Sequence, residues 1–421
     1  MLINNIKSQQ NTNLIDTGYL KLKLTNNLER PLPNVSVKIS FSGDPTDTIE
    51  QLTTDSSGLT ENLPLKAPPI ELSLDKANNI MPYSEYTAYI TAEGYEPLAV
   101  SGIEIFSSRN AILPVTLTPS VPALFPEDIV IPAHTLYGYY PPKIAEAKIK
   151  PIRESGEIVL SRVVVPETII VHDGTPSDNT AKDYYVKFTD YIKNVASSEI
   201  YSTWPESTIT ANILAILSFT MNRIYTEWYR NKGYSFNITS STAYDHKWIY
   251  GRNIFENISV IVDEIFDQYL SLPNVKQPIL TQYCDGKRVT CPEWLSQWGS
   301  KYLGDIGYSP IEILRNYYGE DIYINSAESI SGIPSSWPGY NLTIGARDDK
   351  VLMLQKQLNE IGKVYKSIQN LNPDGIYGAK TAEAVKEFQS IFGLPESGTT
   401  DFKTWYKISQ IYVGVARLAE R

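Results

Sequence analysis

Residues 209–228 read ITANILAILSFTMNRIYTEW, and this stretch decides the fold of the middle of the chain. Its apolar residues recur at helical spacing, namely Ile209, Ile213, Leu217, Met221, Ile224 and Trp228. Other apolar residues fill the neighbouring faces, so we expect a helix that is buried at the centre of its domain. Ser202 or Thr203 is expected to cap this helix, with Pro205 in its first turn.

Chain length, net charge and the first residues exclude several classes of protein. A chain of 421 residues is expected to form two or three domains. The formal net charge of −10 argues against a nucleic-acid partner and gives no support for binding to anionic lipid. The first residues, MLINNIKSQQNTN, do not form a signal peptide, and no apolar run is long enough to span a bilayer. We therefore expect synthesis in a cytoplasm, no membrane partner, and delivery by a route other than a cleaved signal.

Residues 1–118 are predicted to be all-β. Alternation places two sets of apolar residues on single strand faces: Leu20, Leu22 and Leu24, then Val35, Val37, Ile39 and Phe41. Short alternating strands at regular spacing predict a small β-sandwich. The stretches PLPNVSVKI, DSSGLT and AEGYEPL resemble the transthyretin-like or carboxypeptidase-regulatory-like sandwiches.

Residues 119–166 are interrupted by prolines, which rule out long helices. The stretch HTLYGYYPPK (134–143) holds too many aromatic residues for a solvated tether. We therefore expect a strap that lies across a neighbouring domain. Arg153 and Arg162 would suit a processing protease.

Residues 341–421 are predicted to form a compact helical module, in which DKVLMLQKQLNEIG (349–362) sets its apolar residues on one stripe. In the next helix, Thr381 is the expected cap. The string DGIYGAKTAEAVKEFQ (374–389) and the closing LPESGTTDFKTW resemble the three-helix peptidoglycan-binding domain of cell-wall hydrolases. This resemblance implies a glycan-binding module that includes Asp374, Tyr377 and Thr381.

Residues 167–333 mix helix and strand and are expected to form an α+β domain. The stretches NVASSEIYSTWP (194–205) and LSQWGSKYLGDIGYSPIEILRNYYG (295–319) resemble the catalytic domain of the stage II sporulation protein D family of lytic transglycosylases. The family's catalytic glutamate falls on Glu199. The order of sandwich, strap, catalytic domain and wall-binding module is similar to that of clostridial spore cortex-lytic enzymes. That resemblance implies action on spore cortex peptidoglycan and a pro-region that a germination protease removes.

Some positions depart from that family or suggest other chemistry. Thr210 and Leu217 stand where the family usually has a lysine and an arginine facing the cleft. The three histidines are scattered and no zinc-ligand spacing occurs, so neither a metal site nor a cofactor is expected. Cys284 and Cys291, seven residues apart, could form a disulfide or stay as buried thiols.

A single carboxyl group is enough for a lytic transglycosylase, whereas glycoside hydrolysis usually takes two. The C6 hydroxyl of the muramic acid itself attacks C1, so one carboxyl first protonates the leaving oxygen and then removes the C6 hydroxyl proton. Such an acid needs an apolar surrounding, which Tyr201 and Trp204 are placed to supply. From the residue pattern alone, Glu199 would only favour the N-terminus of the following helix. The family resemblance favours the catalytic role.

Polar and aromatic residues near Glu199 and in two later stretches are candidates for glycan contacts. They are Tyr201, Trp204, Ser240, Ser241, Thr242, Tyr244, Ser296, Gln297 and Trp298. Each of them could equally serve a turn or the packing of the core.

These interpretations predict a spore cortex lytic transglycosylase, made as a zymogen and located in the spore, with cortex peptidoglycan and an activating germination protease as partners. One alternative is an N-acetylmuramoyl-L-alanine amidase, although most such amidases hold zinc with histidines. Another is a non-enzymatic spore protein that binds the wall or self-assembles. The sequence does not define the processing site or the oligomeric state.

Overall fold

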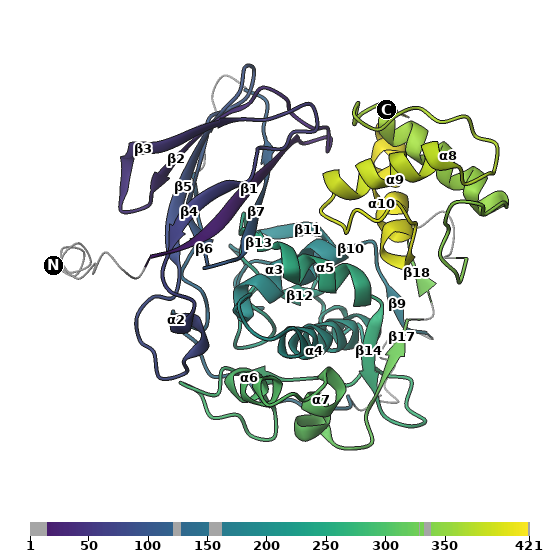
Figure 1. The fold of residues 1–421 in the computed structure, drawn as a ribbon. Coiled ribbons are helices and arrows are strands. Elements are labelled where there is room, and N and C mark those ends of the chain that lie inside the picture. Colours follow the sequence, from purple (N-terminus) through teal and green to yellow (C-terminus); the bar gives the residue numbers. More distant parts are fainter. Residues whose placement is uncertain (1–14, 121–127, 151–161, 328, 332–337, 420–421) are drawn as a thin grey trace.

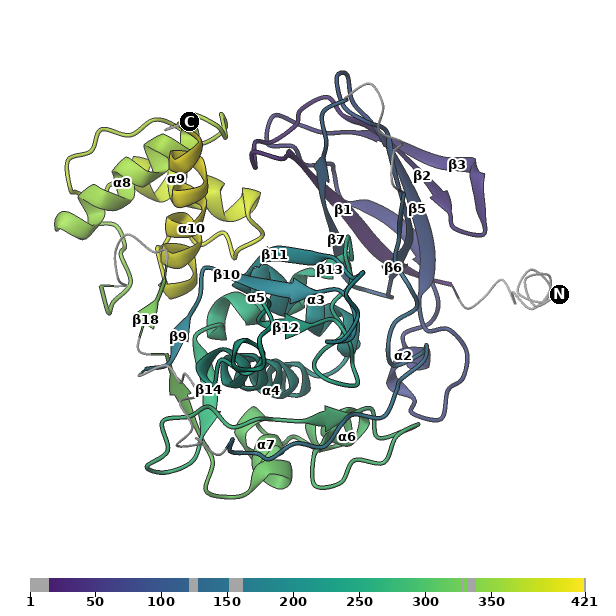
Figure 2. The same ribbon diagram turned by 180° about the vertical axis from the view of Figure 1, so that it is seen from behind.

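The computed structural model describes residues 15–120, 128–150, 162–327, 329–331 and 338–419. Figure 1 shows a β-sandwich built mainly from N-terminal residues, a mixed central domain, and a helical C-terminal module. The sandwich and the module both lie against the central domain, and the view from behind shows the same arrangement (Figure 2). The chain is therefore multidomain, as predicted.

The sandwich consists of two sheets, with strand orders β13-β7-β1-β4 and β3-β2-β5-β6-β8. The strands are β1 (Asp16–Asn26), β2 (Ser36–Phe41), β3 (Asp44–Thr53), β4 (Leu63–Ala67), β5 (Ser84–Thr91), β6 (Leu98–Ile105), β7 (Asn110–Leu117), β8 (Ile129–Val130) and β13 (Ile254–Phe255). A short helix, α2 (Glu71–Leu74), lies between β4 and β5. The relation of this sandwich to the transthyretin-like folds stays a prediction.

Most of the predicted inward residues of the first strands are buried, namely Leu20, Leu22, Leu24, Val35, Val37 and Ile39. Phe41 was expected on the same face, but its side chain is 44% exposed. The pairing of β2 with β3 shifts register on both sides of Ser40, so Ser40 turns inward and Phe41 turns out. The prediction for Phe41 was therefore wrong because a bulge reverses the alternation.

The sandwich is joined to the central domain by backbone pairing and by buried charge. Strand β13 comes from the central domain and pairs antiparallel with β7 at the edge of a sandwich sheet. Next to it, the Arg252 guanidinium forms a buried ion pair with Glu104 of β6. Separating such a pair would leave a charge uncompensated in the interior, so these contacts hold the two parts firmly together.

Helix α4 (Glu206–Tyr225) is the core of the central domain, and every residue from Ala211 to Tyr225 is buried. The predicted buried helix is confirmed. It begins directly after Pro205 without a side-chain cap, so the predicted cap by Ser202 or Thr203 is wrong. The Thr203 hydroxyl instead donates to the Ser73 hydroxyl, 2.8 Å away in the sandwich.

Several short elements surround α4 (Figure 1). The helices are α3 (Phe188–Glu199), α5 (Glu256–Ile265), α6 (Gln297–Asp305), α7 (Pro310–Tyr318) and the 3-10 turn η1 (Arg230–Lys232). The strands are β9 (Val164–Val165), β10 (Thr168–His172), β11 (Asp183–Lys187), β12 (Ile238–Thr239), β14 (Gln268–Ser271), β15 (Tyr283–Cys284), β16 (Leu295–Ser296), β17 (Tyr323–Ser326) and β18 (Ser329–Ile330). They form small sheets of two or three strands: β11-β10-β12, β14-β17, β15-β16 and β18-β9.

Residues 128–150, called the strap from here on, contain no helix and one two-residue strand, β8. The strap runs along the central domain beside α6 and α7 (Figure 2). Its side chains His134, Leu136 and Tyr140 are buried. A segment that buries its own aromatic residues in this way packs as part of the fold and is not a free linker.

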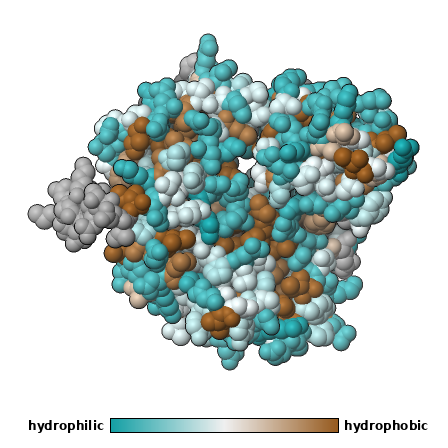
Figure 3. Space-filling model, in the orientation of Figure 1, coloured by the Kyte–Doolittle hydropathy of each residue, from teal (hydrophilic) through white to brown (hydrophobic). Residues whose placement is uncertain are grey.

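The C-terminal module consists of α8 (Asp349–Gly362), α9 (Ala379–Ile391) and α10 (Phe402–Ala419). Its core contains the predicted inward residues Val351, Leu354, Leu358, Ile361, Ala384, Val385, Phe388 and Ile391. The predicted cap by Thr381 is wrong, because Gly378 is the residue that precedes the first turn of α9. On the face drawn in Figure 3, a hollow separates part of the module from the sandwich, and hydrophobic residues are scattered among hydrophilic ones.

Candidate catalytic site

Glu199 is the last residue of α3 and is completely buried. It was expected to stand just before a helix, where a negative charge is stabilised by the helix dipole. It lies instead at the C-terminal end of a helix, where the dipole disfavours a carboxylate. The dipole therefore gives no structural reason for an acid at this position, and that simpler interpretation of Glu199 is wrong.

Two neighbouring segments contact the Glu199 side chain. The backbone N–H of Lys247 donates to one carboxylate oxygen at 2.7 Å. The Gln297 amide nitrogen lies 2.9 Å from the Glu199 carbonyl oxygen and 3.4 Å from the other carboxylate oxygen. Gln297, a predicted substrate-binding residue, thus meets the predicted catalytic residue from the first turn of α6.

Aromatic rings line the same region. The ring centroids of Trp204 and Trp298 are 5.0 Å apart, and Tyr201 lies edge-on to both. All three were predicted as substrate contacts, and all three are buried. Residues from outside the central domain cover them: Tyr201 packs on Phe106 and His134, and the Trp204 indole N–H donates to the Ser73 carbonyl oxygen at 3.0 Å.

The strap lies against the residues on both sides of Glu199: the Thr135 hydroxyl donates to the Ser198 carbonyl oxygen at 2.6 Å, and His134 Nε2 lies 3.3 Å from the Ile200 carbonyl oxygen. Burial, with a smaller contribution from the Glu199 charge, raises the pKa of Tyr140 well above its ordinary value. Burial lowers the pKa of Lys143, and the negative charge of Glu199 partly opposes that shift. The Lys143 ammonium lies over the Tyr283 ring, 4.4 Å from its centroid, and donates to the Asp245 carbonyl oxygen. A phenol and an ammonium from the strap are therefore close enough to Glu199 for its charge to influence their pKa values.

A second cluster, made of charged side chains that include Asp245, anchors the strap to the central domain. The Arg223 guanidinium on α4 binds Asp245 at 2.7 Å and Glu146 of the strap at 2.6 and 3.0 Å. Lys150 of the strap forms a further ion pair with Glu146. Burial and the positive charges of Lys143 and Arg223 lower the pKa of the neighbouring His246 well below its ordinary value, so His246 is neutral near pH 7.

Several buried polar atoms of this part of the central domain and of the strap have no hydrogen-bond partner among the described residues. They include Tyr140 Oη, His246 Nε2, Tyr283 Oη, Gln297 Oε1 and Trp298 Nε1. Buried polar groups are normally satisfied, and each unsatisfied one costs about 1–3 kcal/mol. These groups are therefore available to bond buried water or a polar ligand.

Several residues of this site were not predicted from the sequence. Tyr140 and Lys143 come from the strap, and Tyr191, His246 and Tyr283 come from three separate segments of the central domain. Tyr191 Oη lies 3.1 Å from His246 Nδ1, and the His246 and Tyr283 rings are stacked. The one signal for the strap residues was the aromatic stretch 134–143.

The loop that holds Ser240, Ser241, Thr242 and Tyr244 leads directly to Lys247, the residue that binds Glu199. The strap also pairs with this loop, because the Ile144 N–H donates to the Ala243 carbonyl oxygen at 2.8 Å. Ser296 has a structural role: it is the N-cap of α6, and its hydroxyl accepts from the Gly299 N–H at 3.0 Å.

In the C-terminal module, Tyr377 and Thr381 are buried and do not line an exposed surface. The Tyr377 hydroxyl donates to the Gly398 carbonyl oxygen, and the Gln355 amide donates to both Thr381 Oγ1 and the Asp374 carboxylate. These three residues therefore shape the module, and their part in glycan binding stays a prediction.

A cavity of about 640 Å³ lies where the three parts of the molecule meet. Its wall includes Arg109 of the sandwich, Trp204 and Glu206 of the central domain, and Leu394 of the module, but not Glu199. Among the described residues, no group of three or more His, Cys, Asp and Glu side chains is arranged to hold a metal ion. Within the same residues, none of the helices combines the length and the apolar character needed to cross a membrane.

Comparisons with known proteins bear on separate parts of the chain. No curated protein was found to match it. The minor pilin GBS52 of Streptococcus agalactiae is 17% identical over 27% of this chain and 49% of its own length, with a TM-score of 0.19. Catechol 1,2-dioxygenase from Acinetobacter sp. ADP1 is 15% identical over 29% of this chain and 60% of its own, also with a TM-score of 0.19. The chain thus spans between about half and three-fifths of the length of these structures.

The C-terminal module has a specific match. Residues 347–408 match the family model described as a putative peptidoglycan binding domain. The matched range includes the whole motif DGIYGAKTAEAVKEFQ (374–389), on which the predicted resemblance rested. The chain is therefore a multidomain protein that carries a C-terminal peptidoglycan-binding domain.

Proposed function

We propose that this protein is a peptidoglycan lytic transglycosylase of the spore cortex, held inactive by its own strap and sandwich until germination. Glu199 would serve as both acid and base. The observation that carries this proposal is the setting of Glu199: a buried carboxyl at a helix C-terminus, bonded to Lys247 N–H and Gln297, among polar atoms that lack partners.

The proposed reaction needs one proton carrier. The Glu199 carboxyl donates its proton to the oxygen of the MurNAc–GlcNAc bond as that bond breaks. The resulting carboxylate accepts the proton of the muramic acid C6 hydroxyl as that oxygen bonds to C1, which gives a 1,6-anhydro sugar. General acid–base catalysis of this kind typically contributes about 10² to 10⁴ in rate. The Gln297 amide would keep the carboxyl in place between the two steps.

The aromatic and polar surroundings fit a sugar chain. Trp204, Trp298 and Tyr201 offer flat apolar faces for pyranose rings, and the partnerless hydroxyl and amide groups offer hydrogen bonds to sugar hydroxyls. In the full chain Tyr201 packs on Phe106 and His134, and the Trp204 indole N–H is bonded to the Ser73 carbonyl oxygen. The peptidoglycan-binding module would hold the enzyme on the wall while the covering is removed.

Removal of the covering would require proteolysis after the strap and then dissociation of the sandwich, which the pairing of β13 with β7 and the Arg252–Glu104 pair hold against the central domain. Arg162 is exposed and follows the strap, whereas Arg153 lies outside the described residues. A germination protease that cuts in this region would separate the sandwich and the strap from Glu199 in the chain. The N-terminal part would then act as a pro-region.

The test compares two glutamine variants of the protein after its strap has been cleaved and removed. Glu199→Gln preserves the shape of the side chain and its bond from Lys247, but it carries no exchangeable carboxyl proton. We expect about a thousand-fold slower release of anhydro-muropeptides from spore cortex, measured by mass spectrometry, with wall binding unchanged. Glu206→Gln, at the exposed start of α4, is the matched control and should retain activity. Equal activity of the two variants would remove Glu199 from the mechanism.

Two observations favour a second candidate function, that of a wall-binding spore protein without enzymatic activity. Glu199 is fully buried in the uncleaved chain, and Leu217, in place of a family residue expected to face the cleft, is buried in the core of α4. The same cortex digestion separates the candidates, because a binding protein releases nothing before or after cleavage. It also detects an amidase, which would free stem peptides and leave the glycan ends unchanged.

A further inference from the structure

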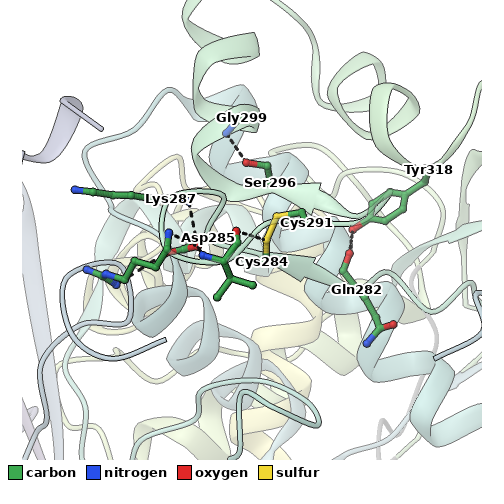
Figure 4. Close-up of a disulfide and its surroundings, with 10 residues drawn as sticks. Gln282, Cys284, Asp285, Lys287, Cys291, Ser296, Gly299 and Tyr318 are labelled. Carbon is green, nitrogen blue, oxygen red and sulfur yellow. Dashed lines mark hydrogen bonds and ion pairs between the residues drawn. A yellow bond between two sulfur atoms is a disulfide. The ribbon is translucent and has the colours of Figure 1, made fainter. Parts of the chain in front are cut away.

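The loop between β15 and β16 is closed by a disulfide between Cys284 and Cys291, whose Cα atoms are 5.6 Å apart (Figure 4). The two strands flank the candidate site: β15 carries Tyr283, and β16 leads into Gln297. Neither cysteine has a part in the proposed reaction. The sequence left open whether these cysteines are bonded, and the structure joins them.

Side chains of this loop form hydrogen bonds to both the strap and the sandwich. The Arg288 guanidinium donates to three consecutive strap carbonyl oxygens, those of Thr135 at 2.9 Å, Leu136 at 2.8 Å and Tyr137 at 2.6 Å. The Lys287 ammonium donates to the carbonyl oxygen of Asn78 in the sandwich. Hydrogen bonds from a charged group are stronger than neutral ones, so Arg288 is a principal attachment of the strap.

Two restraints fix the position of Arg288. The buried Asp285 carboxylate accepts from the N–H groups of Lys287, Arg288 and Val289 at 3.0–3.1 Å (Figure 4). The disulfide fixes the far end of the same turn by tying Cys291 back to β15. Opening a short closed loop increases the number of conformations it can adopt. Without the disulfide, Arg288 would therefore spend less time at the three strap carbonyls.

The disulfide can be reached from outside. Cys284 is fully buried, but Cys291 is partly exposed and lines a surface cavity of about 330 Å³ together with Thr290, Trp294 and Tyr317. This volume admits a small thiol. Cys291 is therefore the cysteine that an attacking thiolate would approach first.

We infer that Cys284–Cys291 is a thiol–disulfide exchange site and that its reduction loosens the loop's hold on the strap. A small dithiol would attack Cys291 Sγ, and Cys284 would leave as a thiolate that takes up a proton. The second thiol of the reagent would then displace Cys291 and form a cyclic disulfide. Two electrons pass from the dithiol to the protein, and two cysteine thiols result. The effect on activity rests on the proposed function, but the loosening of the strap does not.

Hydrogen–deuterium exchange of the full chain tests this inference without any activity measurement. Peptides that contain the bonded amides of Thr135, Tyr137 and Gly138 are followed in oxidised protein and in protein reduced with dithiothreitol. We expect their exchange to become at least tenfold faster on reduction, which corresponds to about 1.4 kcal/mol. Peptides from α8 should not change. Arg288→Ala should show the faster exchange with the disulfide intact.

A Cys284→Ser/Cys291→Ser double variant provides the control for side effects of the reductant. It should exchange quickly in the strap and show no response to dithiothreitol. Equal strap exchange in oxidised and reduced wild-type protein would overturn the inference, as would alkylation of both cysteines in unreduced protein. Either result leaves the role of Glu199 untouched. If strap exchange in the full-length protein responds to reduction but the cleaved protein is inactive, only the proposed function is contradicted.

Discussion

Replacement of Glu146 by Gln tests how strongly the strap is attached to the central domain. Burial alone would raise the pKa of Glu146, but hydrogen bonds and charges from Arg223 and Lys150 outweigh it and lower the pKa from 4.5 to about 2. Lowering the pKa from 4.5 to about 2 corresponds to about 3 kcal/mol of stability. The Glu146 side chain is only 13% exposed, so screening by solvent reduces this value little.

The direction of the pKa shift determines how the stabilisation by Glu146 depends on pH. The folded-state pKa of Glu146 is depressed, so its contribution is complete above the unfolded value near 4.5 and is lost as the pH falls toward 2. At pH 7, Glu146→Gln should therefore lower the melting temperature of the central domain by about 6–12 °C, measured by scanning calorimetry. The difference between variant and wild type should shrink as the pH is lowered from about 5 to 2.

Glu264→Gln is the matched control, because Glu264 pairs with Lys403 on the surface and its side chain is 47% exposed. Exposed pairs contribute less than about 1 kcal/mol, so this variant should change the melting temperature by only a few degrees. A Glu146 variant that melts like the control at pH 7, or a difference that persists at pH 2, would refute the reasoning.

Three further predictions concern single residues. In cleaved protein, Gln297→Ala should lower the turnover of cortex about tenfold or more, because the carboxyl loses its positioning amide. The control Ser296→Ala removes a helix cap, so it should cost about 1 kcal/mol of stability and leave turnover intact. Lys193→Met should destabilise the protein by about 3–5 kcal/mol in urea unfolding, because it leaves Asp263 charged and unpaired in the interior. Tyr377→Phe should cost about 1 kcal/mol through the lost bond to Gly398 and should leave wall binding unchanged if Tyr377 is structural.

Much of the fold was predictable because its signals are local and periodic. Apolar spacing indicated the buried helix α4 and the core of the C-terminal module, and alternation indicated the inward residues of β1. The predictions failed where a local rule was overridden. A bulge at Ser40 exposed Phe41, and the N-cap positions of α4 and α9 are occupied by Pro205 and Gly378, which make no side-chain cap bond.

The candidate site was predictable only in part, because it is assembled from distant segments. The motifs around residues 199 and 297 indicated two side chains that do meet. The aromatic stretch 134–143 was the one signal for Tyr140 and Lys143, and Tyr283 has no local pattern that marks it. The influence of Glu199 on Tyr140 and Lys143 depends on how the strap crosses the central domain. The end of α3 at Glu199 was also missed, since the polar sequence ASSE does not show helical periodicity.

The most direct test of the central claim measures cortex cleavage before and after the strap is removed from the folded protein. A specific protease site is introduced between residues 151 and 161, the protein is cut, and the N-terminal fragment is separated from the rest. Uncut protein should bind cortex and release almost nothing, whereas the separated C-terminal part should release muropeptides with 1,6-anhydro ends. Equal release by both forms, or no release by either, would contradict a catalytic carboxyl kept covered by the strap.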